Sequence, residues 1–202
     1  MRNIAVVFFA SISALLVVWM GVQYCQKIVR GQAHPTITTW IIFELGVVMS
    51  LVTYFSAREH SVVKNVTNAS DCVMVSAILI TLFVKRWGEK LRFSRNEHVC
   101  LAISAVAFVA WAISRDPIIG NIGFQVVMVV AYGPLVERLW LWKKIRSPEP
   151  FSNWAASALA GFFGFCAAFA GRDGLAMLYP ARSALFCIFV LFLIKRIEAR
   201  SA

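Results

Sequence analysis

Apolar and polar positions divide the chain into seven long apolar segments that short polar connections separate. The segments run approximately over 4–29, 36–57, 69–87, 98–114, 120–142, 151–171 and 175–194. About 20 helical residues cross the hydrocarbon core of a bilayer, and each segment has about that length or more. The pattern therefore predicts an all-α integral membrane protein with seven transmembrane helices, surrounded by the lipid bilayer.

One junction between segments occurs twice. Residues 30–40 (RGQAHPTITTW) join the basic end of the first segment to the start of the second, and residues 144–154 (KIRSPEPFSNW) join the fifth to the sixth. A repeat of this kind is typical of two copies of one bundle packed about a shared path. It predicts two parallel three-helix bundles joined by a linker helix, a 3+1+3 arrangement. The bundles and linker would occupy residues 1–90, 91–117 and 118–202.

The basic residues predict the orientation. Six lysines and arginines flank the N-terminus and the loops on its side of the membrane, whereas fourteen flank the other side. The side richer in basic residues is cytoplasmic, so the N-terminus is expected outside and the C-terminus in the cytoplasm. Tryptophans near the predicted cytoplasmic ends fit an interfacial aromatic belt: Trp40, Trp87, Trp140, Trp142 and Trp154.

The N-terminal apolar stretch has an alternative interpretation as a cleaved signal peptide. The apolar run continues through Met20, which is too long for the hydrophobic region of a signal peptide. We therefore interpret it as the first membrane span. The compact length of the chain suggests a bacterial inner membrane.

Composition limits the function classes further. The chain is 60% hydrophobic and 15% charged, with a net charge of +10. The basic residues lie between apolar segments rather than along one solvated face, so they argue for membrane orientation and against nucleic-acid binding. The five cysteines are widely spaced and predict no metal site or cofactor. No phosphate-binding loop, nucleophile elbow or pair of catalytic carboxylates is present, so we do not expect an enzyme.

A motif around the second copy of the repeat suggests a family. Residues 132–135 (YGPL) run into residues 143–152 (KKIRSPEPFS), which supply basic residues and then a serine at the start of the next span. With the 3+1+3 topology, this resembles the SWEET and PQ-loop superfamily of seven-transmembrane transporters. Leu135 stands where that family usually has Gln, and Met20-Gly21 replaces Pro-Gln in the first repeat. The resemblance covers the whole chain at the level of topology and implies alternating-access transport.

Three charged side chains inside the predicted spans are candidates for a functional role. Glu44 lies about one helical turn beyond Trp40, where an acid costs about 3 kcal/mol unless it faces protein or water. Glu44 is either a proton or substrate site or a helix-end partner of Arg30. Aligning the third and seventh spans puts Asp71 and Arg182 at about the same outer depth. They form a pair that gates or binds a polar substrate, or Asp71 caps its helix and Arg182 snorkels outward.

Uncharged side chains complete the predicted substrate site. Asn121 and Gln125 are four residues apart and share one helix face, Tyr179 lies in the outer part of the last span, and Ser76 lies deeper in the third. Asn121 has a second interpretation as a helix cap. Pro134 removes a backbone hydrogen bond within the fifth span and is predicted to be either a hinge or a static kink.

These features lead to a functional hypothesis. The chain is expected to be a transporter that moves a small polar solute, such as a sugar, an amino acid or a vitamin-like molecule, by alternating access. Glu44 is the residue through which proton coupling would act. The alternative is a non-transporting PQ-loop-like membrane receptor or adaptor. Either interpretation allows a homo-oligomer.

Overall fold

The computed structural model describes residues 2–33, 35–57, 60–88, 90–91, 93–142, 147 and 149–200. These residues form eight helices and no strand: α1 (Arg2–Val29), α2 (Ile37–Phe55), α3 (Val66–Lys85), α4 (Arg95–Ser114), α5 (Pro117–Ala131), α6 (Gly133–Trp140), α7 (Phe151–Ala170) and α8 (Gly174–Ala199). Counting α5 and α6 together, seven helices in the described part of the chain are long and apolar enough to cross a membrane. The predicted all-α build is confirmed, and in the described residues seven helices have the length and apolar character that a membrane span requires. His34 of the first repeat copy, and residues 144–146 and 148 of the second, lie outside the described residues.

Polar side chains set several of the helix starts. The hydroxyl of Ser94 accepts a hydrogen bond from the backbone of Glu97, whose carboxylate reaches back to the backbone of Ser94 and completes a capping box on α4. Asp116 caps α5, with Pro117 as the first helical residue, and Asp173 caps α8. These caps begin α4 and α5 three residues, and α8 one residue, before the predicted spans.

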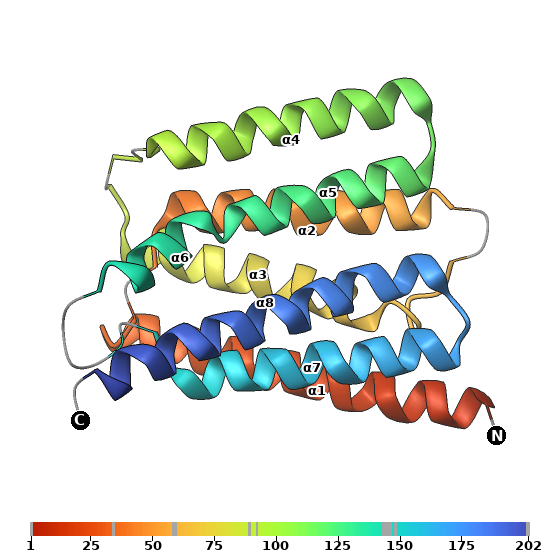
Figure 1. Ribbon diagram of the computed structural model, residues 1–202, viewed down its shortest axis with the longest axis horizontal. Coiled ribbons are helices and arrows are strands. Elements are labelled where there is room, and N and C mark those ends of the chain that lie inside the picture. Colours follow the sequence, from red (N-terminus) through yellow and green to blue (C-terminus); the bar gives the residue numbers. More distant parts are fainter. Residues whose placement is uncertain are drawn as a thin grey trace.

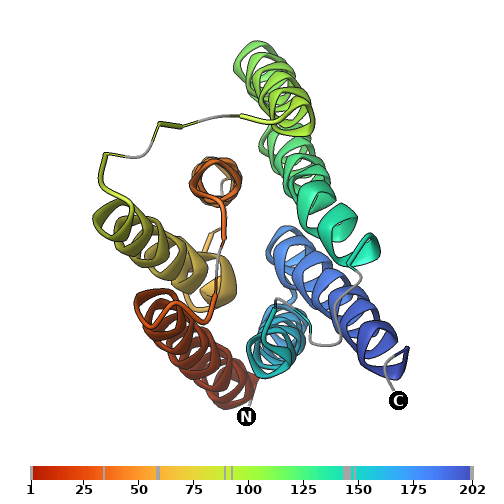
Figure 2. The same cartoon turned by 90° about the vertical axis from the view of Figure 1, so that its left-hand side faces the viewer.

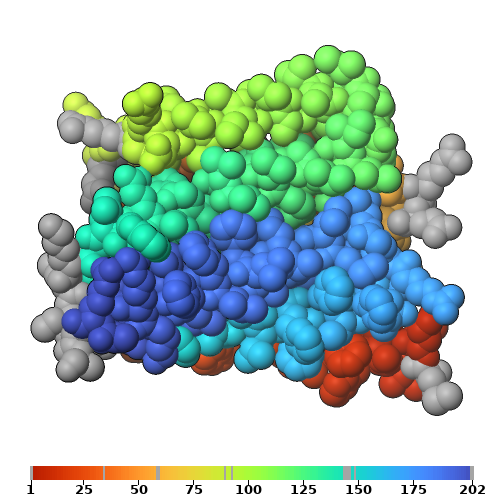
Figure 3. All heavy atoms as spheres, in the orientation of Figure 1, coloured from red at the N-terminus to blue at the C-terminus, as the bar shows by residue number. Residues whose placement is uncertain are grey.

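Six helices form a closed ring, and α4 lies outside it. In ring order, α1 packs against α3, α3 against α2, α2 against α5, α5 against α8, α8 against α7, and α7 against α1. The end-on view shows this ring and the position of α4 beside α5 (Figure 2). In the space-filling view, α4, α5 and α8 follow one another across one face (Figure 3). The core of the protein therefore lies inside the ring.

The two termini lie at opposite ends of the bundle (Figure 1). We name these the N-terminal end and the C-terminal end. The N-terminal end also carries the connections α2–α3, α4–α5 and α7–α8, and the C-terminal end carries α1–α2, α3–α4 and α6–α7. All connections are short, so no separate domain lies between the described helices.

The fifth span is interrupted where the sequence places Pro134. Helix α5 ends at Ala131, Tyr132 forms the junction, and Gly133 and Pro134 open α6. Proline has no backbone N–H to donate, so it suits the first turn of a helix and not its interior. The interruption lies at Tyr132, two residues before Pro134, the residue that the sequence predicts to be a hinge or a static kink.

Small residues on α7 allow close helix contacts in the ring. A Cβ atom on Gly164 would lie 1.7 Å from the Thr67 hydroxyl of α3, and one on Gly161 would lie 2.8 Å from the backbone nitrogen of Ala184 on α8. Ala160, on the same helix, is also fully buried. These positions let α7 approach both α3 and α8 closely.

Candidate functional site

A cavity lies inside the ring of helices. It offers about 90 Å³ to the centres of water molecules, and since one such molecule needs roughly 10–15 Å³, the cavity has room for a small solute. All six ring helices contribute to its wall, and α4 and α6 do not. Its polar and charged lining residues are Thr67, Asp71, Asn153, Ser157, Arg182 and Ser183.

Aromatic side chains form much of the remaining wall. The ring of Tyr132 lies between two others, with its centroid 4.8 Å from that of Phe43 and 4.7 Å from that of Phe186. Tyr24 and Trp40 pack together with centroids 5.4 Å apart. Because such contacts fix ring positions, they give the cavity a defined shape.

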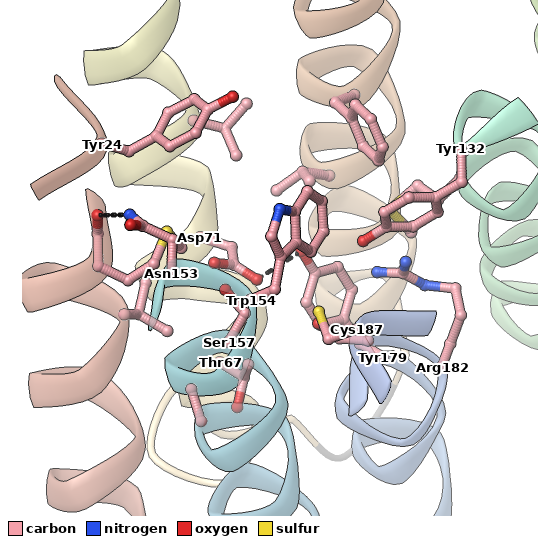
Figure 4. Close-up of a pocket in the computed structure, with 18 of the residues that line it drawn as sticks. Tyr24, Thr67, Asp71, Tyr132, Asn153, Trp154, Ser157, Tyr179, Arg182 and Cys187 are labelled. Atoms are coloured by element: carbon pink, nitrogen blue, oxygen red, sulfur yellow. Dashed lines mark hydrogen bonds between the residues drawn. The ribbon is translucent and has the colours of Figure 1, made fainter. Parts of the chain in front are cut away.

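Asp71 reaches the cavity from the second turn of α3. Its Oδ2 atom accepts a hydrogen bond from the Tyr179 hydroxyl at 2.9 Å (Figure 4). Helix α3 begins at Val66, so Asp71 is too far into the helix to cap it. The interpretation of Asp71 as a helix cap is therefore wrong.

Arg182 enters the same cavity from α8. Its Nε atom donates to Gln125 Oε1 at 2.8 Å, and its guanidinium carbon lies 4.8 Å from the centroid of the Tyr179 ring. The Tyr132 hydroxyl points toward the guanidinium (Figure 4). Nη1 is buried and has no hydrogen-bond partner among the described residues. Because Arg182 faces the protein interior, its interpretation as a snorkelling surface residue is wrong.

The two opposite charges share the cavity without forming a direct ion pair. The salt bridges of the described residues do not include Asp71 with Arg182. Tyr179 separates them, because its hydroxyl bonds Asp71 while the face of its ring receives Arg182. The predicted proximity of the two residues is present, and each keeps part of its binding capacity free.

Gln125 and Asn121 lie behind Arg182 and do not line the cavity. Gln125 Nε2 donates to Ser50 Oγ at 2.8 Å, and Asn121 Nδ2 donates to the Ser50 carbonyl at 3.0 Å. The side-chain amide of Asn68 lies within 3.0 Å of the same Ser50 hydroxyl. All four side chains are buried. This network fixes Gln125, which in turn holds Arg182, so Asn121 belongs to the support of the site and does not cap α5.

Glu44 and Ser76 pair with each other outside the cavity. Ser76 Oγ donates to Glu44 Oε1 at 2.5 Å, while Glu44 Oε2 is buried and has no hydrogen-bond partner among the described residues. No described contact joins Glu44 to Arg30, so its interpretation as a helix-end partner of that arginine is not supported. Of the seven predicted substrate residues, the cavity brings together Asp71, Tyr179 and Arg182.

Two tryptophans line the cavity although their sequence positions predicted a different location. Trp40 and Trp154 were expected in an interfacial belt, but both line the cavity. Figure 4 shows Trp154 projecting into the middle of the site. They hold the same position in the two copies of the repeat, which was the available signal that they face a shared axis. Asn153, beside Trp154, was also missed, and its amide donates to the carbonyl of Met20 on α1 at 3.2 Å.

A second cavity adjoins the first toward the C-terminal end. Four aromatic residues line both cavities and therefore form the partition between them: Tyr24, Trp40, Phe43 and Trp154. Pro134, the predicted hinge, lines this second cavity together with Arg138 and Glu149. A solute leaving the first cavity at this end would have to pass the aromatic partition and then these charged residues.

Glu149 lines this second cavity and holds the surrounding helices together. It lies in the connection between α6 and α7, is only 4% exposed, and forms an ion pair with Arg138 of α6. Its Oε2 atom also accepts hydrogen bonds from Trp154 Nε1 at 3.3 Å and from the Tyr24 hydroxyl at 3.4 Å. Burial raises the pKa of the Glu149 carboxyl, although Arg138 and these hydrogen bonds act in the opposite direction. One carboxylate thus ties together α1, α6 and α7.

The N-terminal end of the central cavity is closed by neutral groups. Ser13 on α1 shares a hydrogen bond with Thr67 on α3 at 2.8 Å and donates to the Ala160 carbonyl on α7 at 2.9 Å. These residues are buried, and Thr67 and Ala160 also line the cavity. Three helices are therefore joined at this end by direct packing and short hydrogen bonds.

Neither metal ligands nor relatives identify the site. Among the described residues, no group of three or more His, Cys, Asp or Glu side chains could hold a metal ion. Comparison of the chain with protein-family models, with curated proteins and with solved structures gave no match. What the cavity does must therefore follow from its own geometry and chemistry.

Proposed function

We propose that this protein is a membrane transporter for a small polar solute and that the central cavity is its binding site. The observation that carries the proposal is a cavity between six spanning helices that contains opposite charges with unused binding capacity. Charged groups inside a membrane protein are costly, and they are typical of substrate and ion pathways. A merely structural pair would be expected to close on itself.

The packing order of the helices supports two related halves. Exchange of the halves would relate α1 to α5–α6, α2 to α7 and α3 to α8. The α1–α7 contact then corresponds to the α5–α2 contact, and α1–α3 corresponds to α5–α8; all four contacts are present. We therefore propose the 3+1+3 arrangement, with α4 as the linker and the cavity on the axis between parallel halves.

Alternating access follows from this arrangement. The halves meet along α1–α7 and α2–α5, and rocking at these contacts would open one end of the cavity while closing the other. In the proposed orientation the N-terminal end faces outside and the C-terminal end faces the cytoplasm. The break at Pro134 lets α6, which carries Arg138, change direction without moving α5, so Pro134 serves as the hinge.

Uptake into proteoliposomes tests this function. A panel of radiolabelled solutes would include a sugar, a neutral amino acid and a small carboxylic acid. We expect saturable uptake of one class, with at least a tenfold loss in Asp71→Ala and in Arg182→Ala. Arg172→Ala is the matched control, because Arg172 is an exposed arginine in the α7–α8 turn. Ligand-dependent stabilisation without flux of any solute would contradict transport and favour the receptor or adaptor alternative.

A further inference from the structure

We propose that the solute is a small zwitterion, whose anionic group binds Arg182 and whose cationic group binds Asp71. This inference rests on the proposed role of the cavity as the binding site. It deepens that role by assigning a chemical class, and it gives Gln125 the function of positioning Arg182.

The cavity contains one group of each sign, and they do not neutralise each other by direct contact. A solute with a single charge would satisfy one of them and leave the other without a partner of opposite sign. Leaving a buried charge without its partner is costly. The solute that best fits the cavity is therefore one that carries both charges. An uncharged sugar would satisfy neither charge, because hydroxyl groups offer hydrogen bonds only.

Arg182 is arranged to receive an anionic group. Gln125 Oε1 occupies its Nε atom, whereas the buried Nη1 atom has no hydrogen-bond partner among the described residues. A guanidinium fixed at one edge presents its remaining N–H groups in a set direction, which suits the two oxygens of a carboxylate. The anionic group is therefore expected beside Nη1 of the guanidinium.

Asp71 and the aromatic wall are arranged to receive a cationic group. The structure gives Asp71 one hydrogen bond, from Tyr179 to Oδ2, and the residue is half-buried with the cavity at its side. Trp154 projects into the same space (Figure 4). An ammonium group near a carboxylate and an aromatic face gains from both. A primary ammonium and a quaternary ammonium share this chemistry.

Gln125 acts through Arg182 and does not contact the solute. It joins Arg182 on one side to the Ser50 hydroxyl on the other, at 2.8 Å in each case. Loss of the amide would release the guanidinium while leaving its charge in the cavity. Gln125 is therefore a positioning residue, and its removal should weaken binding of the anionic group more than binding of the cationic group.

Thermal stabilisation of the purified full-length protein tests the assignment with a matched set of probes. The probes are alanine and glycine betaine as zwitterions, ethylamine as the cation alone, propionate as the anion alone, and glucose. A ligand that binds only the folded state raises the melting temperature. We expect stabilisation by at least one zwitterion at concentrations tenfold lower than any other probe requires. Stabilisation by glucose, or equal stabilisation by a singly charged probe, would overturn the inference.

Charge-neutral variants make the test independent of folding defects. Asp71→Asn should lose the zwitterion response and bind propionate instead, and Arg182→Gln should lose it and bind ethylamine. Loss of one ligand with gain of another cannot come from misfolding. Gln125→Leu should weaken zwitterion binding about tenfold, and in the Arg182→Gln variant, which has no guanidinium to position, it should leave ethylamine binding unchanged. If both charge variants instead bind alanine like the unmodified protein, the assignment is wrong.

The outcomes also separate this inference from the proposed function. Flux of glucose or propionate in proteoliposomes, without flux of a zwitterion, would leave transport standing and refute the zwitterion assignment. Absence of flux for every probe, with stabilisation by alanine or betaine, would refute transport and leave the assignment standing.

Discussion

The two ends of the central cavity are closed in different ways. At the N-terminal end, Ser13, Thr67 and the backbone of Ala160 form short neutral hydrogen bonds between closely packed helices. At the C-terminal end, closure depends on Glu149, a charged residue in a connecting turn, and on its ion pair with Arg138. One closure is made by helices against helices, and the other by a turn inserted between helices.

For the proposed transport cycle, this difference predicts which end opens more readily. Breaking the packed contacts of the N-terminal end would expose apolar surface and separate helices along their length. Opening the C-terminal end returns two ions to water, and the recovered hydration offsets much of the lost attraction between them. In the proposed orientation, the cytoplasmic gate is therefore the more mobile gate.

The largest expected effect follows from removing one partner of the ion pair. Arg138→Met should destabilise closure at the C-terminal end by about 2–3 kcal/mol, because Glu149 is left buried without its counter-ion. This value is below that of a fully buried pair, since the Arg138 side chain is 31% exposed. The measurement is the rate at which a thiol reagent labels Cys187, which lines the cavity and is only 1% exposed. The rate should rise at least tenfold.

Cys100 provides the control for this measurement. It is equally buried but packs against Ile42 and Ala131, away from the cavity wall. Each cysteine would be studied alone, with the other four replaced by alanine. If Cys100 labelling rises as much as Cys187 labelling, the substitution has loosened the whole bundle and the proposed gate is not supported.

A smaller effect is expected from disturbing the packed end. Gly164→Ala places a methyl group against the Thr67 hydroxyl, so α7 and α3 must separate or Thr67 must rotate. Overpacking of this kind costs about 2 kcal/mol and should lower the melting temperature. Gly174→Ala is the matched control, since a Cβ atom there meets no atom within 4 Å. Equal melting temperatures for the two variants would show that close packing does not hold the N-terminal end.

The smallest effect is the pH dependence of the charged end. Burial raises the pKa of Glu149 in the closed state, so this state binds a proton more tightly than an open state in which the carboxyl is hydrated. Closure should therefore be favoured below the raised pKa and weakened as the pH rises through it. Arg138 opposes the shift, which keeps the effect modest.

Cys187 labelling in Glu149→Gln isolates this contribution. The variant lacks the titrating carboxyl but shares the pH dependence of the thiol chemistry. As the pH rises from mildly acidic to alkaline, we expect the Cys187 labelling rate of the unmodified protein to increase more than that of Glu149→Gln. A constant ratio of the two labelling rates across this range would exclude Glu149 as a pH-dependent element of the gate.

The candidate site was predictable in part: the positions of Asp71 and Arg182 at the cavity were predicted correctly, whereas the role of Gln125 was not. Charges within apolar segments are rare enough to mark Asp71 and Arg182 as important, and both line the cavity. The same criterion selected Glu44, which instead pairs with Ser76 outside the cavity. Gln125 was chosen as a lining residue but supports Arg182 from behind. Depth in the membrane could be estimated from the sequence, whereas direction around the helix axis could not.

The sequence by itself determined the seven spanning helices and the break near Pro134. Segment length must match the bilayer, and proline cannot donate a backbone hydrogen bond; both constraints act locally. Only the tertiary structure decided which side chains meet. It placed Trp154 in the cavity, separated Asp71 from Arg182 by Tyr179, and buried Glu149 beside Arg138. These outcomes depend on how each helix is rotated against its neighbours, which is set by packing between residues far apart in the chain.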